Sequence, residues 1–370
     1  MVKLLMSIAL VFLHLMIPVA IQASEPSEEI TQMIATLGLR EHSVPVRELP
    51  GWKVPEKVVV WMQTEEQLEG LRAVAPGVEI VGVTSPAQAT EHIGDAQVLL
   101  GICQEPLLAK AEQLHWVQVY WAGVEDCTIL PGMRKGRIIL SNGQRIGSPA
   151  LADHAIAMMM MLMRGLDIFH ANQNADLWQR NSGANLLELG GRTVLVVGLG
   201  GIGTQVAWRA HNLGMRVLAT RNSSRNGPDY VDYVGLADEA ISLAKQADVV
   251  INATPLTDST RGMFNRAFFD AMKESAYFIS VGRGASTVTD DLVAALEKGQ
   301  ITGAGLDVTE PEPLPAGHPL WSTSRVIISP HVASRSDRSF QRLWLLVQEN
   351  LRRYVEGDAL LSVVNIERGY

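Results

Sequence analysis

The sequence predicts an α/β protein with two domains, each built on a parallel sheet. Two observations carry this prediction: short apolar runs alternate with helical patterns along most of the chain, and a glycine-rich turn follows one such run near residue 200. A chain of 370 residues is also long enough for two domains that each bury their own core. We therefore expect a doubly wound sheet around the glycine-rich turn and a smaller α/β domain beside it.

The smaller domain is predicted at residues 24–148 and is completed by residues 335–370. Its strand candidates are short apolar runs at residues 58–62, 78–83, 96–102, 116–121 and 138–141. An amphipathic pattern over residues 340–355 predicts a helix in the completing segment. We expect this last helix to pack back on the smaller domain.

The second domain is predicted at residues 149–334, and it begins with an apolar helix over residues 149–164. Four consecutive methionines, Met158 to Met161, cover all sides of this helix, so other elements or a second subunit should bury it. Asp153 and His154 interrupt the apolar run, and the helix is too short to span a membrane. A core helix is the favoured interpretation, while burial by a second copy makes a homodimer the expected oligomeric state.

The glycine-rich turn follows a buried strand candidate at residues 193–197 and precedes a helix over residues 202–212. The spacing of its glycines permits a tight turn, a close approach of the backbone to a pyrophosphate, and close packing of the helix. The N–H groups at the start of the helix, including that of Ile202, would face the phosphates. The pattern predicts a Rossmann-type sheet that binds a dinucleotide. The glycines concerned are Gly198, Gly200, Gly201 and Gly203.

The residue after the next strand candidate, at residues 215–220, indicates which dinucleotide is preferred. A site for NAD places a carboxylate there, which accepts hydrogen bonds from the 2′-hydroxyl of the adenosine ribose. This chain has Arg221, followed by Ser223 and Arg225, whose donors and positive charges suit a 2′-phosphate. We expect NADP(H) as the preferred cofactor, with NAD(H) possible. The alternative interpretation is a solvated basic loop.

Further strand candidates in this domain end in polar or charged residues. They lie at residues 247–255, 276–282, 304–308 and 326–331. In a doubly wound sheet the ligand lies outside the carboxyl ends of the strands, so residues at those ends are the candidates for a site. These residues are Thr254, Arg283, Asp307 and His331.

Seven short motifs occur in order between residues 57 and 365. They are AGVE at 122–125, GLGGIG at 198–203, PLTDSTRG at 255–262, GRG at 282–284, GLDVTEPEPLP at 305–315, HPLW at 318–321 and SPHVAS at 329–334. This set resembles the D-isomer-specific 2-hydroxyacid dehydrogenase family, in its NADP-preferring glyoxylate/hydroxypyruvate reductase-like branch. The resemblance implies a flavodoxin-like substrate domain and an NAD(P)-dependent interconversion of a small 2-oxo acid and its D-2-hydroxy acid.

The resemblance implies that Arg283, Glu312 and His331 are catalytic. Hydride that arrives at a 2-oxo carbon creates an alkoxide, and His331 is suited to protonate it because histidine titrates in the useful range. A carboxylate on the other ring nitrogen would fix the tautomer; Glu312 matches the family position, and Glu310 is the alternative. Arg283 would hold the substrate carboxylate through paired hydrogen bonds and polarise the keto oxygen.

Other contacts are expected around these residues. The loop formed by Ala122, Gly123 and Val124 should complete the carboxylate site with backbone N–H groups. Asp307 is expected at the nicotinamide amide, with a helix cap or a loop acid as the alternative. Contact with the cofactor or packing of the loop is expected at Thr254 and Thr260. Cofactor contacts are also expected at Pro255, Val281 and Ser334.

Composition excludes several classes of partner. The formal net charge of −8, with scattered Lys and Arg residues, argues against nucleic acid. No Cys/His spacing resembles a metal site, and the spacing of Cys103 and Cys127 permits one disulfide without deciding it. Two other functions stay open: a nucleotide-sensing, non-enzymatic binding protein of the corepressor type on the same fold, and a formate- or phosphite-type dehydrogenase.

Residues 1–23 are typical of a secretory signal peptide. Lys3 precedes an apolar stretch over residues 4–20, and Ala23 is followed by a polar segment. An uncleaved membrane anchor and a misassigned start are the alternatives. A signal peptide implies export to the periplasm, whereas a soluble nicotinamide cofactor is a cytoplasmic metabolite, so the sequence leaves the compartment open.

Overall fold

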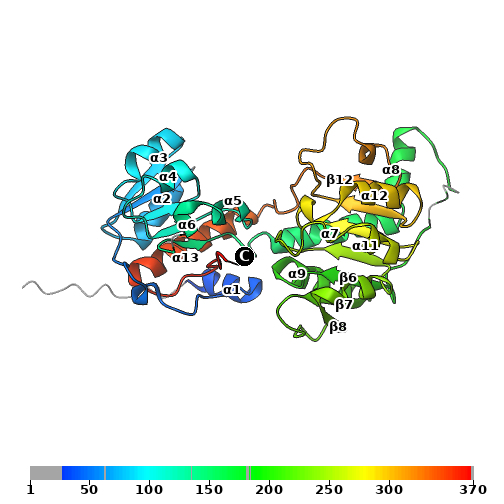
Figure 1. Ribbon diagram of the computed structural model, residues 1–370, viewed down its shortest axis with the longest axis horizontal. Helices are drawn as coiled ribbons and strands as arrows, with labels where there is room; N and C mark the ends of the chain where they lie inside the picture. The colour runs from blue at the N-terminus through cyan, green and yellow to red at the C-terminus, as the bar shows by residue number, and fades with distance from the viewer. Residues whose placement is uncertain (1–26, 62–63, 135, 181–182, 184, 368–370) are drawn as a thin grey trace, which may run out of the picture.

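The structure is a computed structural model that describes residues 27–61, 64–134, 136–180, 183 and 185–367. It contains two parallel sheets, and Figure 1 shows them in two lobes, each covered by helices. This architecture confirms the predicted α/β class with two unequal sheets. The predicted signal peptide at residues 1–23 lies outside the described residues. Within the described part of the chain, no helix combines the length and apolar character needed to cross a membrane.

The first sheet has five strands in the order β2-β1-β3-β4-β5, which is the flavodoxin-like order. Its central strands are buried on both faces, as expected for a parallel sheet covered by helices. Each strand ends within a few residues of the apolar run that predicts it. The strands are β1 (Lys57–Trp61), β2 (Glu79–Val83), β3 (Val98–Leu100), β4 (Trp116–Gln118) and β5 (Ile139–Ser141).

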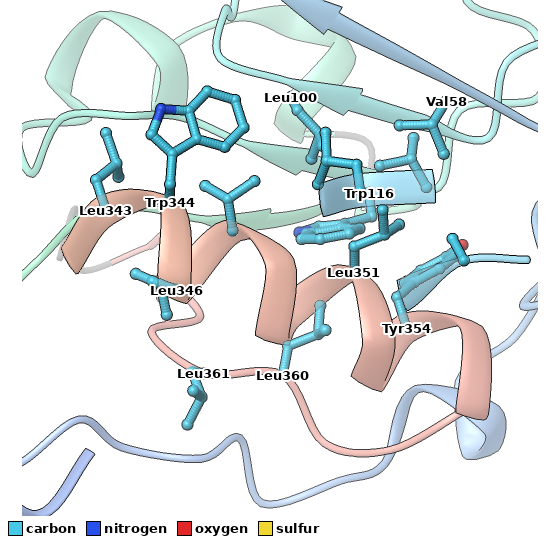
Figure 2. Packing of buried hydrophobic residues seen from close by; sticks show 14 of the residues in the cluster. Val58, Leu100, Trp116, Leu343, Trp344, Leu346, Leu351, Tyr354, Leu360 and Leu361 are labelled. Atoms are coloured by element: carbon cyan, nitrogen blue, oxygen red, sulfur yellow. The ribbon is translucent and has the colours of Figure 1, made fainter. Parts of the chain in front are cut away.

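Helices from both ends of the chain cover this sheet. Early helices are α1 (Glu28–Leu37), α2 (Glu65–Val74), α3 (Pro86–His92), α4 (Glu105–Leu108), α5 (Glu125–Thr128) and α6 (Pro131–Arg134), with a 3₁₀ turn at Val46–Glu48. The last helix, α13 (Ser339–Glu356), follows the second sheet in sequence and packs on the first. Figure 2 shows Leu351 and Tyr354 of α13 against Trp116 of β4. The predicted amphipathic helix therefore closes the smaller domain.

The second sheet has seven parallel strands in the order β12-β11-β10-β9-β6-β7-β8. Its first six strands in chain order follow the 3-2-1-4-5-6 arrangement of a Rossmann sheet, and β12 extends the edge. The strands are β6 (Thr193–Val197), β7 (Arg216–Arg221), β8 (Tyr233–Leu236), β9 (Val249–Asn252), β10 (Tyr277–Ser280), β11 (Gly303–Leu306) and β12 (Val326–Ile328). Its helices are α7 (Ser148–Met163), α8 (Leu166–Asn174), α9 (Gly201–Asn212), α10 (Ala240–Ala244), α11 (Arg266–Ala271) and α12 (Thr289–Glu297), with 3₁₀ turns at Ala237–Glu239, Gly284–Ser286 and Pro319–Trp321.

The methionine-rich helix α7 is buried by its own chain. Met158, Met159 and Met163 pack against α9 and strands of the second sheet, Met161 is half-buried, and Met160 is exposed. The core-helix interpretation is therefore correct. The homodimer stays a prediction, and burial of this helix no longer argues for it.

A disulfide joins Cys103, in the loop after β3, to Cys127 in α5, with their Cα atoms 5.8 Å apart. The spacing of the two cysteines could not decide this bridge. The disulfide ties two loops of the smaller domain at the carboxyl edge of its sheet.

Candidate active site

The register of the second sheet brings the predicted site residues to one edge. The aligned residues near the carboxyl ends of the strands are Ile328, Leu306, Ser280, Asn252, Val197 and Thr220. Loops that follow these positions therefore leave the sheet at the same level. They carry Arg283 after β10, Glu312 after β11 and His331 after β12, in neighbouring positions along the edge.

His331 and Glu312 form the central pair of the site. Nδ1 of His331 lies 2.6 Å from Oε1 of Glu312, and both side chains are partly exposed. Because the carboxylate accepts a hydrogen bond from Nδ1–H, the imidazole presents Nε2 to a ligand. The structure thus places Glu312 on His331, while the side chain of Glu310 is exposed to solvent.

Asp307 anchors the loop that carries His331. Its buried carboxylate accepts hydrogen bonds from Ser329 Oγ at 2.6 Å, and from the backbone N–H groups of Val332 and Ala333 at 3.0 Å each. The backbone N–H of His331 also donates to the carbonyl of Asp307, at 2.9 Å. His331 adopts a positive φ of 51°, a conformation that costs free energy and needs such support. The predicted contact of Asp307 with the nicotinamide amide stays a prediction.

Arg283 lies between two glycines that the local packing requires. A Cβ at Gly284 would come within 1.8 Å of the carbonyl oxygen of Thr309, and one at Gly282 within 2.7 Å of that of Thr254. The loop after β10 is therefore pressed against the loops after β11 and β9. Within it, Nη1 of Arg283 donates to the Gly282 carbonyl at 2.9 Å, which holds the guanidinium against its own loop.

Glu125 connects Arg283 to the smaller domain. Nε of Arg283 donates to Oε1 of Glu125 over 3.1 Å, and Nη2 lies so close to Gly123 that a Cβ there would be 2.2 Å away. The guanidinium thus lies directly on the loop predicted to bind the substrate carboxylate. Sequence reasoning missed Glu125, although the AGVE motif contains it, because its partner is 158 residues away.

The rest of that loop is held by its own domain. The carbonyl of Ala122 accepts a hydrogen bond from Asn142 Nδ2 at 2.6 Å, and the buried Val124 caps the start of α5. A loop fixed in this way keeps its backbone N–H groups in place before a ligand arrives.

The glycine-rich turn fits a dinucleotide. Gly198 has a φ of 97°, and a Cβ at Gly203 would lie 2.1 Å from the carbonyl oxygen of Gly198, so the start of α9 packs directly on the turn. A Cβ at Gly200 would meet no atom within 4 Å, so this part of the turn faces open space. The strand ends one residue before Gly198 and α9 begins at Gly201, as the dinucleotide pattern requires. Ile202 follows in the first turn of α9.

Other predicted cofactor residues line the same edge. Thr260 Oγ1 donates to the carbonyl of Pro255 at 2.7 Å and accepts from Thr257 N–H at 2.8 Å, so it closes the loop after β9. Thr254 is buried on Asn252, Val281 is buried at the end of β10, and Ser334 contacts Gly147 at the junction of the domains. Packing of the loop is what the structure shows for Thr254 and Thr260, and cofactor contact at these positions stays a prediction.

The two arginines in the basic segment after β7 differ in their partners: among the described residues Arg221 has no carboxylate partner, whereas Arg225 has one. Arg221 ends β7 and donates to the carbonyl of Asn226 at 2.7 Å, and Ser223 is exposed. Arg225 instead pairs with Glu239 at 2.8 Å. Hydrogen bonds from Tyr233, from a backbone N–H and from Arg225 lower the pKa of Glu239 to about 2, so this partner is ionised. The prediction that Arg225 binds a phosphate must therefore be tested against an existing ion pair.

Among the described residues, no group of acidic, histidine or cysteine side chains could hold a metal ion.

Comparisons with known proteins agree with this geometry. Residues 156–333 match the family model described as D-isomer specific 2-hydroxyacid dehydrogenase, NAD binding domain. A glyoxylate/hydroxypyruvate reductase A from Photorhabdus laumondii is 31% identical over 273 residues, which covers 71% of this chain and 84% of the relative.

Solved structures show the same similarity over most of the chain. A D-isomer-specific 2-hydroxyacid dehydrogenase family protein from Aeromonas salmonicida has a TM-score of 0.74 at 30% identity, and covers 84% of this chain and 99% of its own. An NADPH-dependent glyoxylate/hydroxypyruvate reductase from Sinorhizobium meliloti, in complex with NADP and sulfate, has a TM-score of 0.74 at 26% identity. The match covers 85% of this chain and 100% of the reductase. This chain belongs to the family of NAD(P)-dependent, D-isomer-specific 2-hydroxyacid dehydrogenases.

Proposed function

We propose that this protein is an NADP(H)-preferring reductase that converts a small 2-oxo acid, of the size of glyoxylate or hydroxypyruvate, into the D-2-hydroxy acid. The observation that carries the proposal is the pair formed by His331 and Glu312 at 2.6 Å, on the sheet edge that also holds the glycine-rich turn. Relatives named for glyoxylate and hydroxypyruvate reduction support the substrate class.

The residues of the chain divide the work between binding and proton transfer. Gly198 to Gly203 would hold the pyrophosphate of the cofactor, which supplies the hydride when bound. Glu125 accepts the hydrogen bond from Nε of Arg283. Nη2, which lies beside Gly123, can then donate to the substrate carboxylate. Nε2 of His331 gives its proton to the oxygen at C2, and Glu312 keeps the imidazole in the required tautomer and stabilises its charged form.

Replacement of His331 tests the proposed chemistry. His331→Ala should lower kcat with NADPH and glyoxylate or hydroxypyruvate by roughly 10²- to 10⁴-fold, because a positioned general acid contributes that much. The affinity for NADPH should stay nearly unchanged, since His331 is not placed among the phosphate contacts. Unchanged turnover in this variant would overturn the proposal.

The cofactor preference is supported by Arg221 at the position where an NAD site has a carboxylate. The NADP complex of the Sinorhizobium meliloti reductase supports the same choice. Parallel assays with NADPH and NADH over a panel of oxo acids test it. A preference for NADH by about tenfold or more, equal to 1.4 kcal/mol, would refute the role of Arg221.

No observation in the described part of the chain favours the alternative of a non-enzymatic, nucleotide-sensing protein. The pairing of His331 with Glu312 at 2.6 Å, beside an arginine that contacts the other domain, does not by itself separate the two functions, because one fold can serve both. Consumption of NADPH with a 2-oxo acid decides between the two functions. Turnover confined to the oxidative direction, with every 2-oxo acid refused, would instead support the formate- or phosphite-type dehydrogenase.

We propose further that the protein matures in an oxidising compartment, such as the periplasm. The disulfide between Cys103 and Cys127 supports this, because disulfides form and persist in such compartments and are rare in the cytosol. Cell fractionation with the mass of the mature N-terminus tests the proposal. A cytosolic protein with two alkylatable thiols would overturn it.

A further inference from the structure

Arg145 links three segments of the molecule at the junction of the two domains. It lies between β5 and α7 with a positive φ of 71°, which a residue other than glycine rarely adopts. Its Nη1 donates to the carbonyl of Leu37 at 3.2 Å, at the end of α1. The stem of the same side chain covers the glycine-rich turn, since a Cβ at Gly201 would lie 2.8 Å from Cγ of Arg145. In Figure 1, α1 lies at the edge of its lobe nearest to α9.

Two further arginines lie close to Arg145. Arg40 is exposed just after α1, and Arg221 ends β7. Burial lowers the pKa of Arg145, and the positive charges of Arg40 and Arg221 lower it further. The three side chains, which we call the arginine cluster, therefore repel one another in the absence of an anion.

No ion pair between described residues includes a member of the arginine cluster. Arg225, four residues after Arg221, shows the opposite arrangement, because Glu239 pairs with it at 2.8 Å. Like charges that gather without a carboxylate are destabilising unless an anion binds to them. The arginine cluster therefore has the chemistry of an anion site.

The position of the arginine cluster identifies the anion. Gly201 begins the helix whose N–H groups face the cofactor phosphates, and the end of β7 is where the adenosine ribose lies in a Rossmann site. The additional phosphate of NADP(H) is on that ribose. A cluster between these two points faces the adenosine half of the cofactor.

We propose that Arg40 and Arg145 act together with Arg221 to bind the 2′-phosphate of NADP(H). This inference rests on the proposed function, and it extends cofactor selection beyond the loop after β7. The segment after α1 and the connection between the domains contribute to it. Guanidinium groups are suited to this role because they bind phosphate through paired, charge-assisted hydrogen bonds.

The test measures binding without turnover, on the full chain. Arg40→Ala removes an exposed side chain, and Arg145→Asn keeps a residue that tolerates a positive φ. Arg72→Ala is the matched control, since Arg72 is an exposed arginine of the same domain that pairs with Glu65 on α2. Calorimetry gives the Kd for NADPH, NADH, 2′,5′-ADP and 5′-ADP, with circular dichroism to check folding.

Arg40→Ala should raise the Kd for NADPH and for 2′,5′-ADP by about 3- to 10-fold. Arg145→Asn should raise both Kd values by about 10-fold or more. Losses of this size are expected when a charge-assisted contact is removed. NADH and 5′-ADP should bind within about twofold of wild type in both variants, and Arg72→Ala should change nothing. The preference for NADPH should also shrink as salt is added, because exposed charges are screened.

Each other outcome overturns the inference in a recognisable way. Equal losses for NADPH and NADH would place the cluster on the pyrophosphate instead of the 2′-phosphate. Wild-type preference for NADPH that survives in both variants would overturn the inference and leave the proposed function intact. A wild type that does not prefer 2′,5′-ADP to 5′-ADP would remove the NADP(H) preference itself. If Arg145→Asn fails to fold, Arg40→Ala alone decides.

Discussion

The carboxyl edge of the second sheet is built differently at its two ends. After β10, β11 and β12, the charged side chains proposed to form the site already have partners: Arg283 has Glu125, His331 has Glu312, and Asp307 has backbone N–H groups. After β6 and β7, the positive charges of the arginine cluster have no carboxylate partner in the described residues. We infer that the end assigned to chemistry is fixed before ligands bind, whereas the end assigned to the cofactor is completed by the phosphate.

The largest effect is expected when the carboxylate of Glu312 is removed from its pair with His331. Glu312→Gln should lower kcat by roughly 10²-fold or more, because the imidazole loses the group that fixes its tautomer and stabilises its charged form. Steady-state kinetics with NADPH measures the loss, and the Kd for NADPH should stay within about twofold, since the other end of the edge is untouched.

Glu310→Gln is the matched control, because Glu310 is an exposed acid two residues away. It should keep wild-type kcat. Equal losses in the two variants would show that the net charge of the loop, and not the contact with His331, supports catalysis.

The residues proposed as catalytic could be located from the sequence because they lie in short motifs after predictable strands. β6 ends where its apolar run ends, and β10 and β12 end two and three residues before their predicted ends at residues 282 and 331. Arg283 and His331 then follow from the rule that parallel strands end at one edge, whereas Glu312 was implied by the family resemblance. The strand order brings their loops to one edge, but it does not give the contact of Arg283 with Glu125.

Glu125, Arg40 and Arg145 could not be predicted in the same way. Their neighbours come from distant segments of the chain: Glu125 pairs with Arg283, 158 residues away, and Arg145 donates to the carbonyl of Leu37, 108 residues away. β8 was missed because it is four residues long and has only two buried positions. Short sequence motifs do not determine contacts between residues that are far apart in the chain.

Removal of the disulfide between Cys103 and Cys127 tests whether the end assigned to chemistry depends on this bond. Cys103→Ser with Cys127→Ser should lower the free energy of unfolding by about 3 kcal/mol, the value for a closed loop of this order of length. The two cysteines are 24 residues apart in sequence. Urea unfolding measures the change.

Reductant should destabilise the wild type by a similar amount and leave the double variant unaffected. Cofactor affinity should not change, because the disulfide packs in the core of the smaller domain and not at the glycine-rich turn. A reductant effect that persists in the double variant would mean that the bridge is not its cause.

Glu125 offers a finer test, since it acts through Arg283 and not on the substrate. Glu125→Gln should lower kcat about tenfold, because Nε of Arg283 loses its charged partner and the guanidinium is held less firmly. KM should not rise, because the substrate carboxylate then meets the full positive charge of Arg283. Separate kcat and KM values for the oxo acid decide the matter, and a raised KM with unchanged kcat would assign Glu125 to ground-state binding.

The smallest effect is expected for the pH dependence of stability caused by His115. This residue is buried in the first domain, away from the carboxyl edge of the second sheet. Its Nδ1 accepts a hydrogen bond from the Tyr354 hydroxyl at 3.0 Å and its Nε2 donates to the carbonyl of Pro50 at 3.2 Å, so the neutral ring satisfies both nitrogens. Burial lowers the pKa of His115 below its ordinary 6.5. The unfolded chain therefore takes up this proton first as the pH falls.

Stability from the neutral ring is thus present above about pH 6.5 and is lost as the pH falls through the lowered pKa. Urea midpoints of wild type and His115→Gln between pH 7.5 and 5.5 isolate this contribution, because every other titrating group is common to both proteins. The wild type should lose more stability over this range than the variant.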